Sequence, residues 1–309
     1  MNQAERRQFL IQELLKENPA WQDVHIPADA GEQRELLRGL LNVRSAKPCG
    51  ETFLKVQDAY LGEETMKKGI TELADLKPVE DGIYLWQGDI TTLRVDAIVN
   101  AANSGMTGCY VPNHRCIDNC IHTFAGVELR LECDRIMREQ GYEEPTGKAK
   151  ITPAYNLPCR YILHTVGPIV GAAPTDGDCR LLESCYRSCL ELAAANGLKS
   201  VAFCCISTGE FHFPNGQAAQ IAVRTVRDFW QRETSVRKVV FNVFKEQDKE
   251  IYSRLLGAAE TAGKCAAEAA GKYADRAASY RSPGSGCGGD RRGSRAVDVG
   301  GIYLCGGAL

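Results

Sequence analysis

Three cysteines and two histidines fall within fifteen residues, GCYVPNHRCIDNCIH, numbers 108–122. Such side chains could form a metal site or a disulfide staple, or they could simply lie on a helix. Other cysteines argue against a disulfide framework: Cys185, Cys189, Cys204 and Cys205 lie in runs typical of helix and strand cores, where free cysteine behaves as a small hydrophobe. In a reducing compartment, a Cys/His cluster is more often a metal or catalytic site.

Cys109, His114 and Cys116 fit a metal site best, because they fall in a loop that contains Pro112 and precedes a predicted helix. In a loop, three side chains can converge, whereas a helix would point positions 114 and 116 to different faces. Two thiolates and one imidazole suit Zn²⁺. Three protein ligands leave the fourth position open for water or substrate, as a catalytic zinc site requires.

The neighbours of this trio leave alternatives open. A structural zinc site would need a fourth ligand, and Cys120 and His122 are candidates, although both fall in the helix and Cys120 fits its buried face. Asp118 is either an N-cap or first-turn acid of that helix, or a general base or substrate orienter beside the metal. Asn103, in NAANS, is either a turn residue or a polar group aimed into the cleft.

The elements that must position these residues follow from hydrophobic periodicity. Residues 1–80 are charged and helix-patterned, with apolar residues at three- and four-residue spacing. From Ile83, short apolar runs alternate with longer helical ones, and VDAIVNAA, SVAFCCIS and RKVVFNVF are apolar on both faces. Strands of that kind are covered by helices on both sides, so residues 83–260 are predicted to form a three-layer α/β domain behind a helical N-terminal extension.

Composition excludes several classes of function. A net charge of -2, from 37 Lys+Arg and 39 Asp+Glu, argues against bulk electrostatic binding of nucleic acid. No apolar run approaches the roughly 20 residues needed to span a bilayer. The charged N-terminus lacks the apolar region of a signal peptide. We therefore expect a cytoplasmic protein without nucleic-acid or membrane partners.

Three loops are placed where an α/β sheet binds its ligands, after the carboxyl ends of strands. They are GDIT at 88–91, the loop that begins with NAANSG at 100–105, and STGEFHFPNGQ at 207–217. In the third loop, Gly209 would let backbone N–H groups approach a phosphate just before a helix N-terminus. By itself, that loop is as readily an ordinary turn.

Taken together, these motifs resemble the macrodomain family. Five motifs occur in the order typical of that family: GDIT at 88–91, VDAIVNAANS at 95–104, TGKAKIT at 146–152, YILHTVGP at 161–168 and ISTGEFHFP at 206–214. Most hydrolytic macrodomains carry a glycine-rich loop after NAANS, whereas the Cys/His stretch here, like the helical extension, is similar to zinc-dependent microbial macrodomains. The resemblance covers roughly residues 83–256. It implies a three-layer α/β/α fold with a mixed central sheet, and one Zn²⁺ per chain on Cys109, His114 and Cys116.

The resemblance also implies a role for individual residues. Asp89 would accept a hydrogen bond from the adenine amino group beside the Ile90 backbone, and Asn103 would orient the distal ribose. Asp118 falls where related hydrolases carry an acid near the scissile bond. Phe244 would stack on adenine, with a plain core position as the alternative. The diphosphate loop, acting largely through backbone N–H groups, would comprise Ser207, Thr208, Gly209, Glu210 and Phe211.

The implied activity is zinc-dependent, glycosidase-type removal of mono-ADP-ribose from protein side chains, through a carboxylate linkage. The alternative is a non-catalytic ADP-ribose-binding module with a structural zinc. The implied partners are a mono-ADP-ribosylated protein, for which a lipoyl-carrier protein is a candidate, and a sirtuin-type ADP-ribosyltransferase. Neither the modified residue nor the oligomeric state is readable from the sequence.

Residues 262–309 depart from the family pattern. They are rich in Ala, Gly and Arg without a sustained period, which predicts a tail of low structural content. Read one base later with suitable codons, RAVDVGGIYL gives a stretch that resembles the nucleotide-binding loop of a sirtuin. The hypothesis is therefore that this tail is an out-of-frame or disordered addition, and the DNA sequence would test it.

Overall fold

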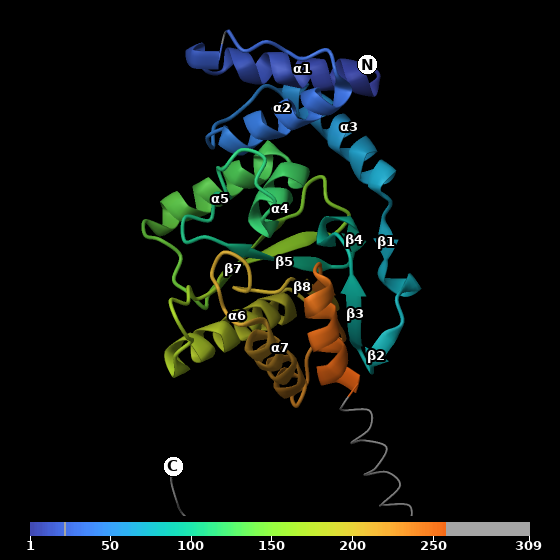
Figure 1. Ribbon diagram of the computed structural model, residues 1–309, viewed down its shortest axis with the longest axis vertical. Helices are drawn as coiled ribbons and strands as arrows, with labels where there is room; N and C mark the ends of the chain where they lie inside the picture. The colour runs from blue at the N-terminus through green and yellow to red at the C-terminus, as the bar shows by residue number, and fades with distance from the viewer. Residues whose placement is uncertain (22, 258–309) are drawn as a thin grey trace, which may run out of the picture. The chain divides into compact units, whose positions relative to one another are not determined.

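A mixed sheet of seven strands lies at the centre of the computed structural model, which describes residues 1–21 and 23–257 (Figure 1). The spatial order is β2-β3-β9-β8-β5-β7-β6. The five inner strands are parallel, and the edge strands β2 and β6 run antiparallel to their neighbours. In spatial order the strands are β2 (Pro78–Glu80), β3 (Ile83–Gln87), β9 (Lys238–Val243), β8 (Ser200–Phe203), β5 (Ala97–Ala102), β7 (Tyr161–Val166) and β6 (Ala149–Pro153).

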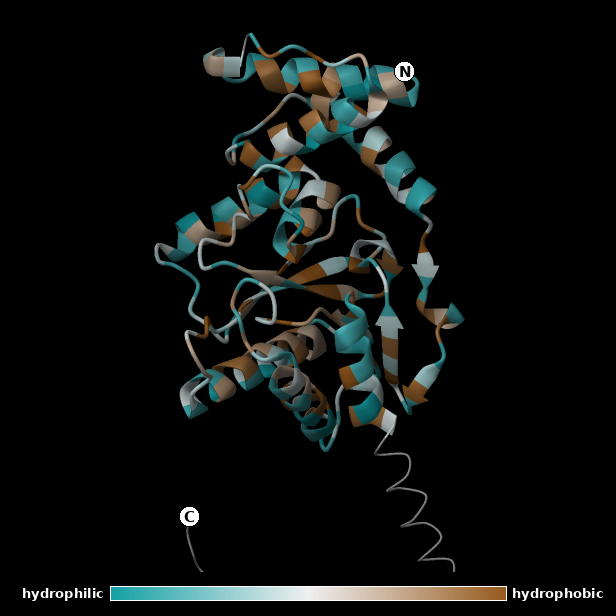
Figure 2. Cartoon of the chain, in the orientation of Figure 1, coloured by the Kyte–Doolittle hydropathy of each residue, from teal (hydrophilic) through white to brown (hydrophobic). Residues whose placement is uncertain are grey.

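The inner strands have the composition that burial on both faces requires. All four residues of β8 are buried, and so are five of the six in β5 and in β9. Figure 2 shows the central strands as largely hydrophobic, while the helices carry mixed faces. Apolar area removed from water on both faces is the main favourable term for such a sheet.

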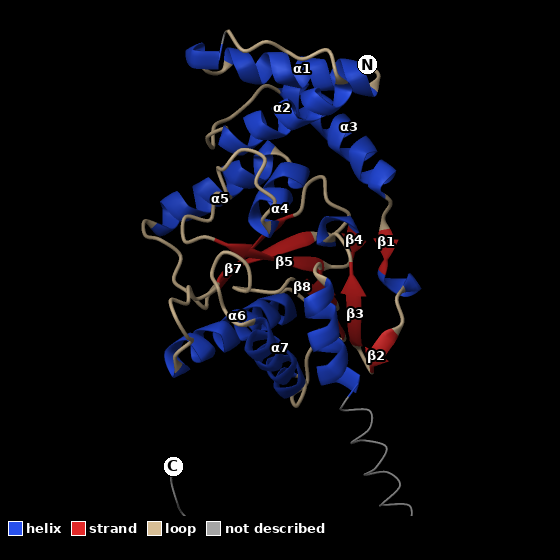
Figure 3. Cartoon of the chain, viewed as in Figure 1, coloured by secondary structure: helices blue, strands red, loops and turns tan. Residues whose placement is uncertain are grey.

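Helices cover both faces of the sheet (Figure 3). One face carries α4 (Ile117–Ala125) and α5 (Val127–Gln140), and the other carries α6 (Asp176–Ala195), α7 (Asn215–Phe229) and helical residues 246–257. The predicted three-layer arrangement with a mixed sheet is confirmed. Local signals fix the ends of these helices: Thr175 and Asp178 form a capping box at the start of α6, and Gly141 ends α5 at a φ of 78°.

Three helices precede the sheet and share a small core of their own. They are α1 (Gln3–Lys16), α2 (Ala30–Val43) and α3 (Glu51–Lys68), and α2 and α3 both contact α4. Asn2 forms a capping box with Glu5, and Asp29 caps α2. Val127 of α5 joins a buried cluster that includes Leu10, Ile11, Leu14, Leu37, Leu40, Phe53 and Leu61. The extension is therefore packed onto the sheet domain on the side of α4 and α5.

The stretch that joins the extension to the sheet differs from the helical segment expected over residues 1–80. It contains β1 (Thr71–Glu72), which pairs with β4 (Leu93–Arg94), then a 3-10 turn and β2. Strands of two or three residues are too short to show an alternating pattern, so hydrophobic periodicity could not reveal them. Residues 262–309, predicted to form the tail, lie outside the described residues. Among the described helices, none is both long and apolar enough to cross a bilayer.

Candidate active site

The predicted loops meet at the carboxyl edge of the parallel strands. Residues 88–92 follow β3, residues 103–116 follow β5, and residues 204–214 follow β8. Because β3, β9, β8 and β5 are parallel neighbours, these loops leave the same edge of the sheet. This is the edge at which α/β sheets bind ligands.

The three predicted metal ligands converge. One ligand atom from each of Cys109, His114 and Cys116 lies within 4.8 Å of the other two, and all three residues are partly exposed. His114 Nδ1 is 3.5 Å from Cys109 Sγ. The helix starts at Ile117, as expected, with Cys116 as its N-cap. The loop turns back on itself through left-handed backbone at Asn113 (φ 55°), a conformation that asparagine tolerates better than most residues.

The donor set fits Zn²⁺. Two sulfurs and one nitrogen in partly exposed positions leave one tetrahedral position for a fourth ligand. Burial raises the pKa of Cys116 to about 12, and the neighbouring Cys109 and Asp118 add to the shift, against a hydrogen bond from the Asn119 N–H. A divalent cation reverses that balance, because a coordinating thiol is deprotonated by the metal.

The third loop contacts residues 108–116, the candidate metal loop, through Glu210. Its Oε1 lies 3.7 Å from His114 Nε2, and its side chain is largely exposed. Because Nδ1 of His114 faces Cys109, Nε2 is the nitrogen left for a carboxylate partner. A carboxylate behind a metal-ligating imidazole fixes the orientation of the ring and raises its basicity.

Asp118 and Asn103 meet at the start of the Cys/His loop, where Asn103 also donates to the Gly108 carbonyl. Asn103 Nδ2 is 3.3 Å from Asp118 Oδ2, and Asn100 Nδ2 donates to Asp118 Oδ1 at 2.8 Å. Asp118 is almost completely buried, and this burial raises its pKa to about 6, against the Asn100 hydrogen bond and the charge of Arg130. Asp118 therefore lies in the first turn of α4, as one of the two sequence alternatives predicted. Its carboxyl group accepts hydrogen bonds from the side-chain amides of Asn100 in β5 and Asn103 in the following loop.

The Asp89 loop is tied to the N-terminal extension. Asp89 Oδ1 accepts from the Thr91 N–H at 3.0 Å, and its Oδ2 pairs with Lys68 Nζ at 3.2 Å. Lys68, the last residue of α3, also lies 3.3 Å from the centre of the Phe124 ring. Ile90 is fully buried behind this turn. One carboxylate oxygen of Asp89 therefore accepts a hydrogen bond within its own turn. The other can bind a ligand only if its ion pair with Lys68 breaks.

The 207–211 loop presents backbone donors. Among the described residues, the N–H groups of Gly209, Glu210 and Phe211 donate to no protein acceptor, while the carbonyls of Gly209 and Phe211 accept from His212 and Val170. Thr208 N–H donates to the Cys205 carbonyl. Free N–H groups in a loop just before α7 are the usual means of binding a phosphate.

The same loop has a strained start. Ser207 has a φ of 64°, and its side chain is buried. A Cβ atom on Gly167, at the end of β7, would come within 2.0 Å of Ser207 Oγ, so only glycine fits there. The close approach of the β7 end therefore holds the first residue of this loop in place.

Phe244 is 77% exposed, which eliminates the core position that the sequence left open. It follows β9 directly, and the Gly88 N–H donates to the Val243 carbonyl at 3.1 Å. Phe244 therefore lies beside the Asp89 loop as an uncovered aromatic ring, the type of side chain that stacks on a base.

Comparison with known proteins identifies the family. The family model described as Macro domain matches residues 99–222. A protein from Treponema medium named Protein-ADP-ribose hydrolase is 61% identical over 260 residues, which are 83% of this chain and 100% of the relative. The chain belongs to the macrodomain family. A Staphylococcus aureus (strain MSSA476) protein of the same name is 51% identical over 249 residues, 80% of this chain and 93% of the relative.

Solved macrodomain structures agree with this assignment. The Oceanobacillus iheyensis macrodomain with ADP is 36% identical, at a TM-score of 0.54, and covers 60% of this chain and 96% of its own. The Trypanosoma brucei macrodomain in complex with ADP-ribose is 30% identical, at a TM-score of 0.54, over 71% of this chain and 94% of its own. In this macrodomain, the family match runs from β5 into α7 and so includes both the Cys/His loop and the 207–211 loop.

The structure adds residues to the site that sequence reasoning missed. Asn100 is fully buried and donates a hydrogen bond to Asp118. The sequence feature that could have indicated this role is a single amide residue within the apolar run AIVNAA. Lys68 contacts Asp89, and Arg38 of α2 contacts the metal loop. Neither of these basic residues carries a sequence signal, since both look like solvated positions on amphipathic helices.

Proposed function

We propose that this macrodomain is a zinc-dependent hydrolase that removes mono-ADP-ribose from carboxylate side chains of proteins. The observation that carries the proposal is the contact between Glu210 and His114, because it brings the Cys109, His114 and Cys116 cluster against the loop with free N–H donors. A metal at that cluster would stand beside the diphosphate of a bound ADP-ribose. The relatives named Protein-ADP-ribose hydrolase, at 61% and 51% identity, support the reaction.

The proposed pose follows the edge of the sheet. Adenine stacks on Phe244, and its amino group donates to Asp89 beside Ile90. The diphosphate lies on Ser207, Thr208, Gly209, Glu210 and Phe211, and receives hydrogen bonds from the free backbone N–H groups of Gly209, Glu210 and Phe211. The distal ribose then reaches Asn103, at the entrance to the Cys/His loop.

In the proposed reaction, water attacks C1 of the distal ribose, and the bond from C1 to the carboxylate oxygen breaks. The carboxylate leaves with the electron pair, through an oxocarbenium-like transition state. Asp118 orients the water and accepts its proton at Oδ2, while Asn100 holds Oδ1. Asn103 positions the ribose. A bound Zn²⁺ supplies Lewis acidity to the ribose oxygens or lowers the pKa of the attacking water.

We also propose a carrier protein and a transferase as partners. The carrier would be a mono-ADP-ribosylated protein such as a lipoyl-carrier protein, modified by a sirtuin-type transferase. A Fusarium oxysporum relative, 43% identical over 246 residues, is named Probable bifunctional ADP-ribose hydrolase/ADP-ribosyltransferase, which joins the two activities in one name. A cytoplasmic location is supported by the described cysteines, all of which are free thiols.

The deciding experiment measures free ADP-ribose released from a carboxylate-modified carrier protein, before and after chelation and after Zn²⁺ is restored. We expect chelation to slow release at least about 100-fold, because a Lewis acid contributes several kcal/mol to the transition state. An arginine-linked carrier is the matched control and should not be cleaved. Calorimetric binding of ADP-ribose without release would instead establish a binding module with a structural zinc.

A further inference from the structure

The metal loop is held from outside the sheet domain, by α2 of the N-terminal extension. Arg38 donates through one nitrogen to the His114 carbonyl at 2.9 Å and to Asn119 Oδ1 at 2.9 Å. The same nitrogen lies 3.4 Å from Cys120 Sγ. Arg38 therefore binds the backbone of a metal-ligating residue that lies 76 positions further along the chain.

Asn119 extends this hold to the start of the loop. Its side-chain nitrogen lies 3.3 Å from the Cys109 carbonyl and 3.1 Å from the Val111 carbonyl, and the residue is completely buried. Because Arg38 binds the oxygen of the same amide, Asn119 is fixed with its donors directed at the loop. The backbones of two of the three ligand residues are thus connected to one guanidinium group.

Asn42, one turn further along α2, holds the middle of the loop. Its Oδ1 accepts from the Asn113 N–H at 2.9 Å, and its Nδ2 donates to Thr123 Oγ1 at 2.8 Å. Asn42 is buried, and its hydrogen bond to Thr123 is shielded from water, while the bond from Asn113 is partly buried. Leaving such buried groups unpaired costs about 1–3 kcal/mol each.

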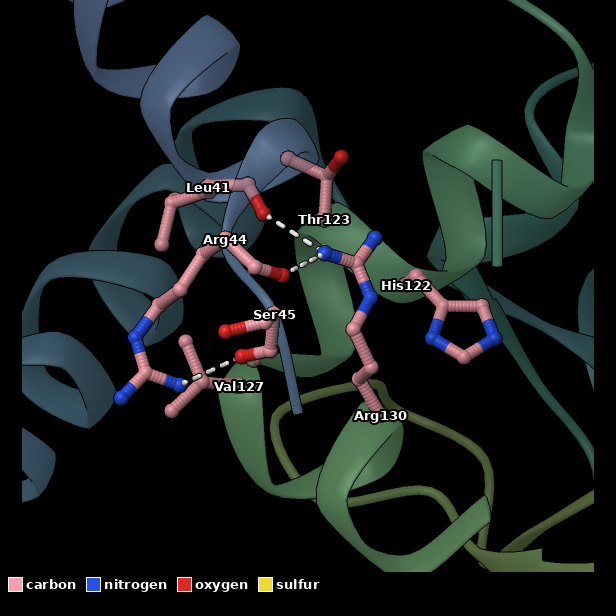
Figure 4. Close-up of a pocket in the computed structure, with 8 residues that line it drawn as sticks. Leu41, Arg44, Ser45, His122, Thr123, Val127 and Arg130 are labelled. Carbon is pink, nitrogen blue, oxygen red and sulfur yellow. Dashed lines mark hydrogen bonds between the residues drawn. The ribbon is translucent and has the colours of Figure 1, made fainter. Parts of the chain in front are cut away.

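Arg130 of α5 fixes α2 in turn. Figure 4 shows its side chain directed at the C-terminal end of α2, where it donates to the carbonyls of Leu41, Asn42 and Arg44. Its Nε also donates to the Thr107 carbonyl at 2.7 Å, just before the metal loop. The last carbonyls of a helix have no partners within the helix, and a cation there is favoured by the helix dipole.

We propose that α2 is part of the metal site, with Arg38 and Asn42 as positioning residues that set the loop for metal binding. Bringing three ligands together in a loop costs conformational entropy, and hydrogen bonds to the loop backbone pay part of that cost before the metal arrives. The inference deepens the proposed function, since it concerns the same metal. It gives the N-terminal extension a defined role in a site formed by another part of the chain.

The test measures Zn²⁺ affinity by competition with a chromophoric chelator, and the absorption spectrum of the Co²⁺-substituted protein. Arg38→Met keeps the apolar stem and removes the donors, so we expect the Zn²⁺ dissociation constant to rise about tenfold or more. The cobalt bands should shift as the ligand geometry relaxes. Arg38→Lys, which keeps the charge and one donor group, should recover part of the affinity. Arg34→Met is the matched control, because Arg34 is an exposed residue of the same helix.

A second measurement needs no metal. In the metal-free protein, hydrogen exchange of the Asn113 amide should accelerate in Asn42→Ala, while amides in the core of β8 stay protected. Unchanged Zn²⁺ affinity in folded Arg38→Met, together with unchanged exchange in Asn42→Ala, would overturn the proposal. If the unaltered chain itself binds no Zn²⁺, the proposed function fails, and the exchange result still decides whether α2 holds the loop.

Discussion

Two clusters of cysteine and histidine lie in the part of the chain that the structure describes, and of these two only the first is accessible to ligands from solvent. The first consists of Cys109, His114 and Cys116, in a partly exposed loop. Its side chains leave the loop from three nearby positions and approach one another, and the Cys116 sulfur also accepts the Asn119 N–H at 3.4 Å. His114 Nδ1 faces a sulfur, and its Nε2 faces Glu210.

The second cluster is the buried trio His122, Cys133 and His164, contributed by α4, α5 and β7. Its ligand atoms are also within 4.8 Å of one another. His164 is occupied on both nitrogens, by Asn100 at 3.1 Å and Thr152 at 2.9 Å. Neither ring nitrogen of His122 has a hydrogen-bond partner among the described residues.

The difference shows that residue types alone do not make a metal site. Burial raises the pKa of both Cys116 and Cys133 to about 12, so thiol acidity does not separate the clusters. What separates them is access to solvent: the three residues of the loop cluster are partly exposed, whereas those of the buried cluster are sealed inside the domain. We therefore expect Zn²⁺ at the loop and none at the buried trio.

The largest expected effect is the loss of a loop ligand. Cys116→Ala should abolish stoichiometric Zn²⁺ binding, measured by elemental analysis, and slow ADP-ribose release at least about 100-fold, because the metal's contribution to the transition state is lost. Full activity in a zinc-free Cys116→Ala protein would contradict the proposed mechanism.

The buried trio should instead respond to pH through stability. Burial lowers the pKa of His164 to about 3, whereas in the unfolded chain it is about 6.5. Below pH 6.5 the unfolded state therefore binds the proton first, and the free energy of unfolding falls as pH falls, until about pH 3. Between pH 7 and 5 the loss from this residue should be about 2 kcal/mol.

Urea unfolding of metal-free protein at the two pH values tests this linkage. His164→Gln introduces an amide that can hydrogen-bond and removes the titrating ring. The free energy of unfolding of this variant should therefore fall by about 2 kcal/mol less than that of the unaltered chain over the same interval. An equal fall in both proteins would show that His164 is not held neutral. Keeping the protein metal-free removes any contribution from the loop cluster.

A smaller effect is expected at Cys133. Cys133→Ala removes one buried sulfur and should lower the free energy of unfolding by about 1 kcal/mol, while the Zn²⁺ content stays the same as in the unaltered chain. Elemental analysis beside thermal unfolding makes the measurement. Loss of one Zn²⁺ equivalent in this variant would mean that the buried trio binds metal after all.

The smallest effect is expected at the rim of the loop cluster. Glu210→Gln removes a largely exposed charge 3.7 Å from His114, so Zn²⁺ affinity should weaken by less than about fivefold, and the change should shrink in high salt. Chelator competition at two salt concentrations measures both. A larger, salt-independent loss would mean that the His114–Glu210 contact is shielded from water.

Much of the fold was predictable because its signals are local. The largely apolar runs of β5, β8 and β9 are typical of strands covered on both faces, and the Pro112 loop placed the three ligands off the helix. The left-handed backbone at Asn113 and the cap at Cys116 agree with that interpretation. Such features depend on neighbours within a few residues, which a sequence displays directly.

The residues that position the site were not predictable in this way. Arg38 and Asn42 lie on an amphipathic helix that reads as a solvated cap, and their partners are 71 to 82 positions away. Lys68 pairs with Asp89 from the end of α3. Contacts of this kind arise from the packing of helices, and no periodicity within either partner encodes them. Phe244 was ambiguous for a related reason, since an aromatic residue at a strand end suits both a core and a surface.

Strand β2 has a practical consequence for dissecting the molecule. A domain cut from the sequence at residue 83 would begin at the first residue of β3, and so would discard the strand that borders it. The unpaired N–H and C=O groups of β3 would become an open sheet edge, a template for pairing with other chains. The same cut would remove α2 and its hydrogen bonds to the metal loop. A shortened chain that aggregates and binds metal poorly would therefore reveal where the domain begins, and would say little about its chemistry.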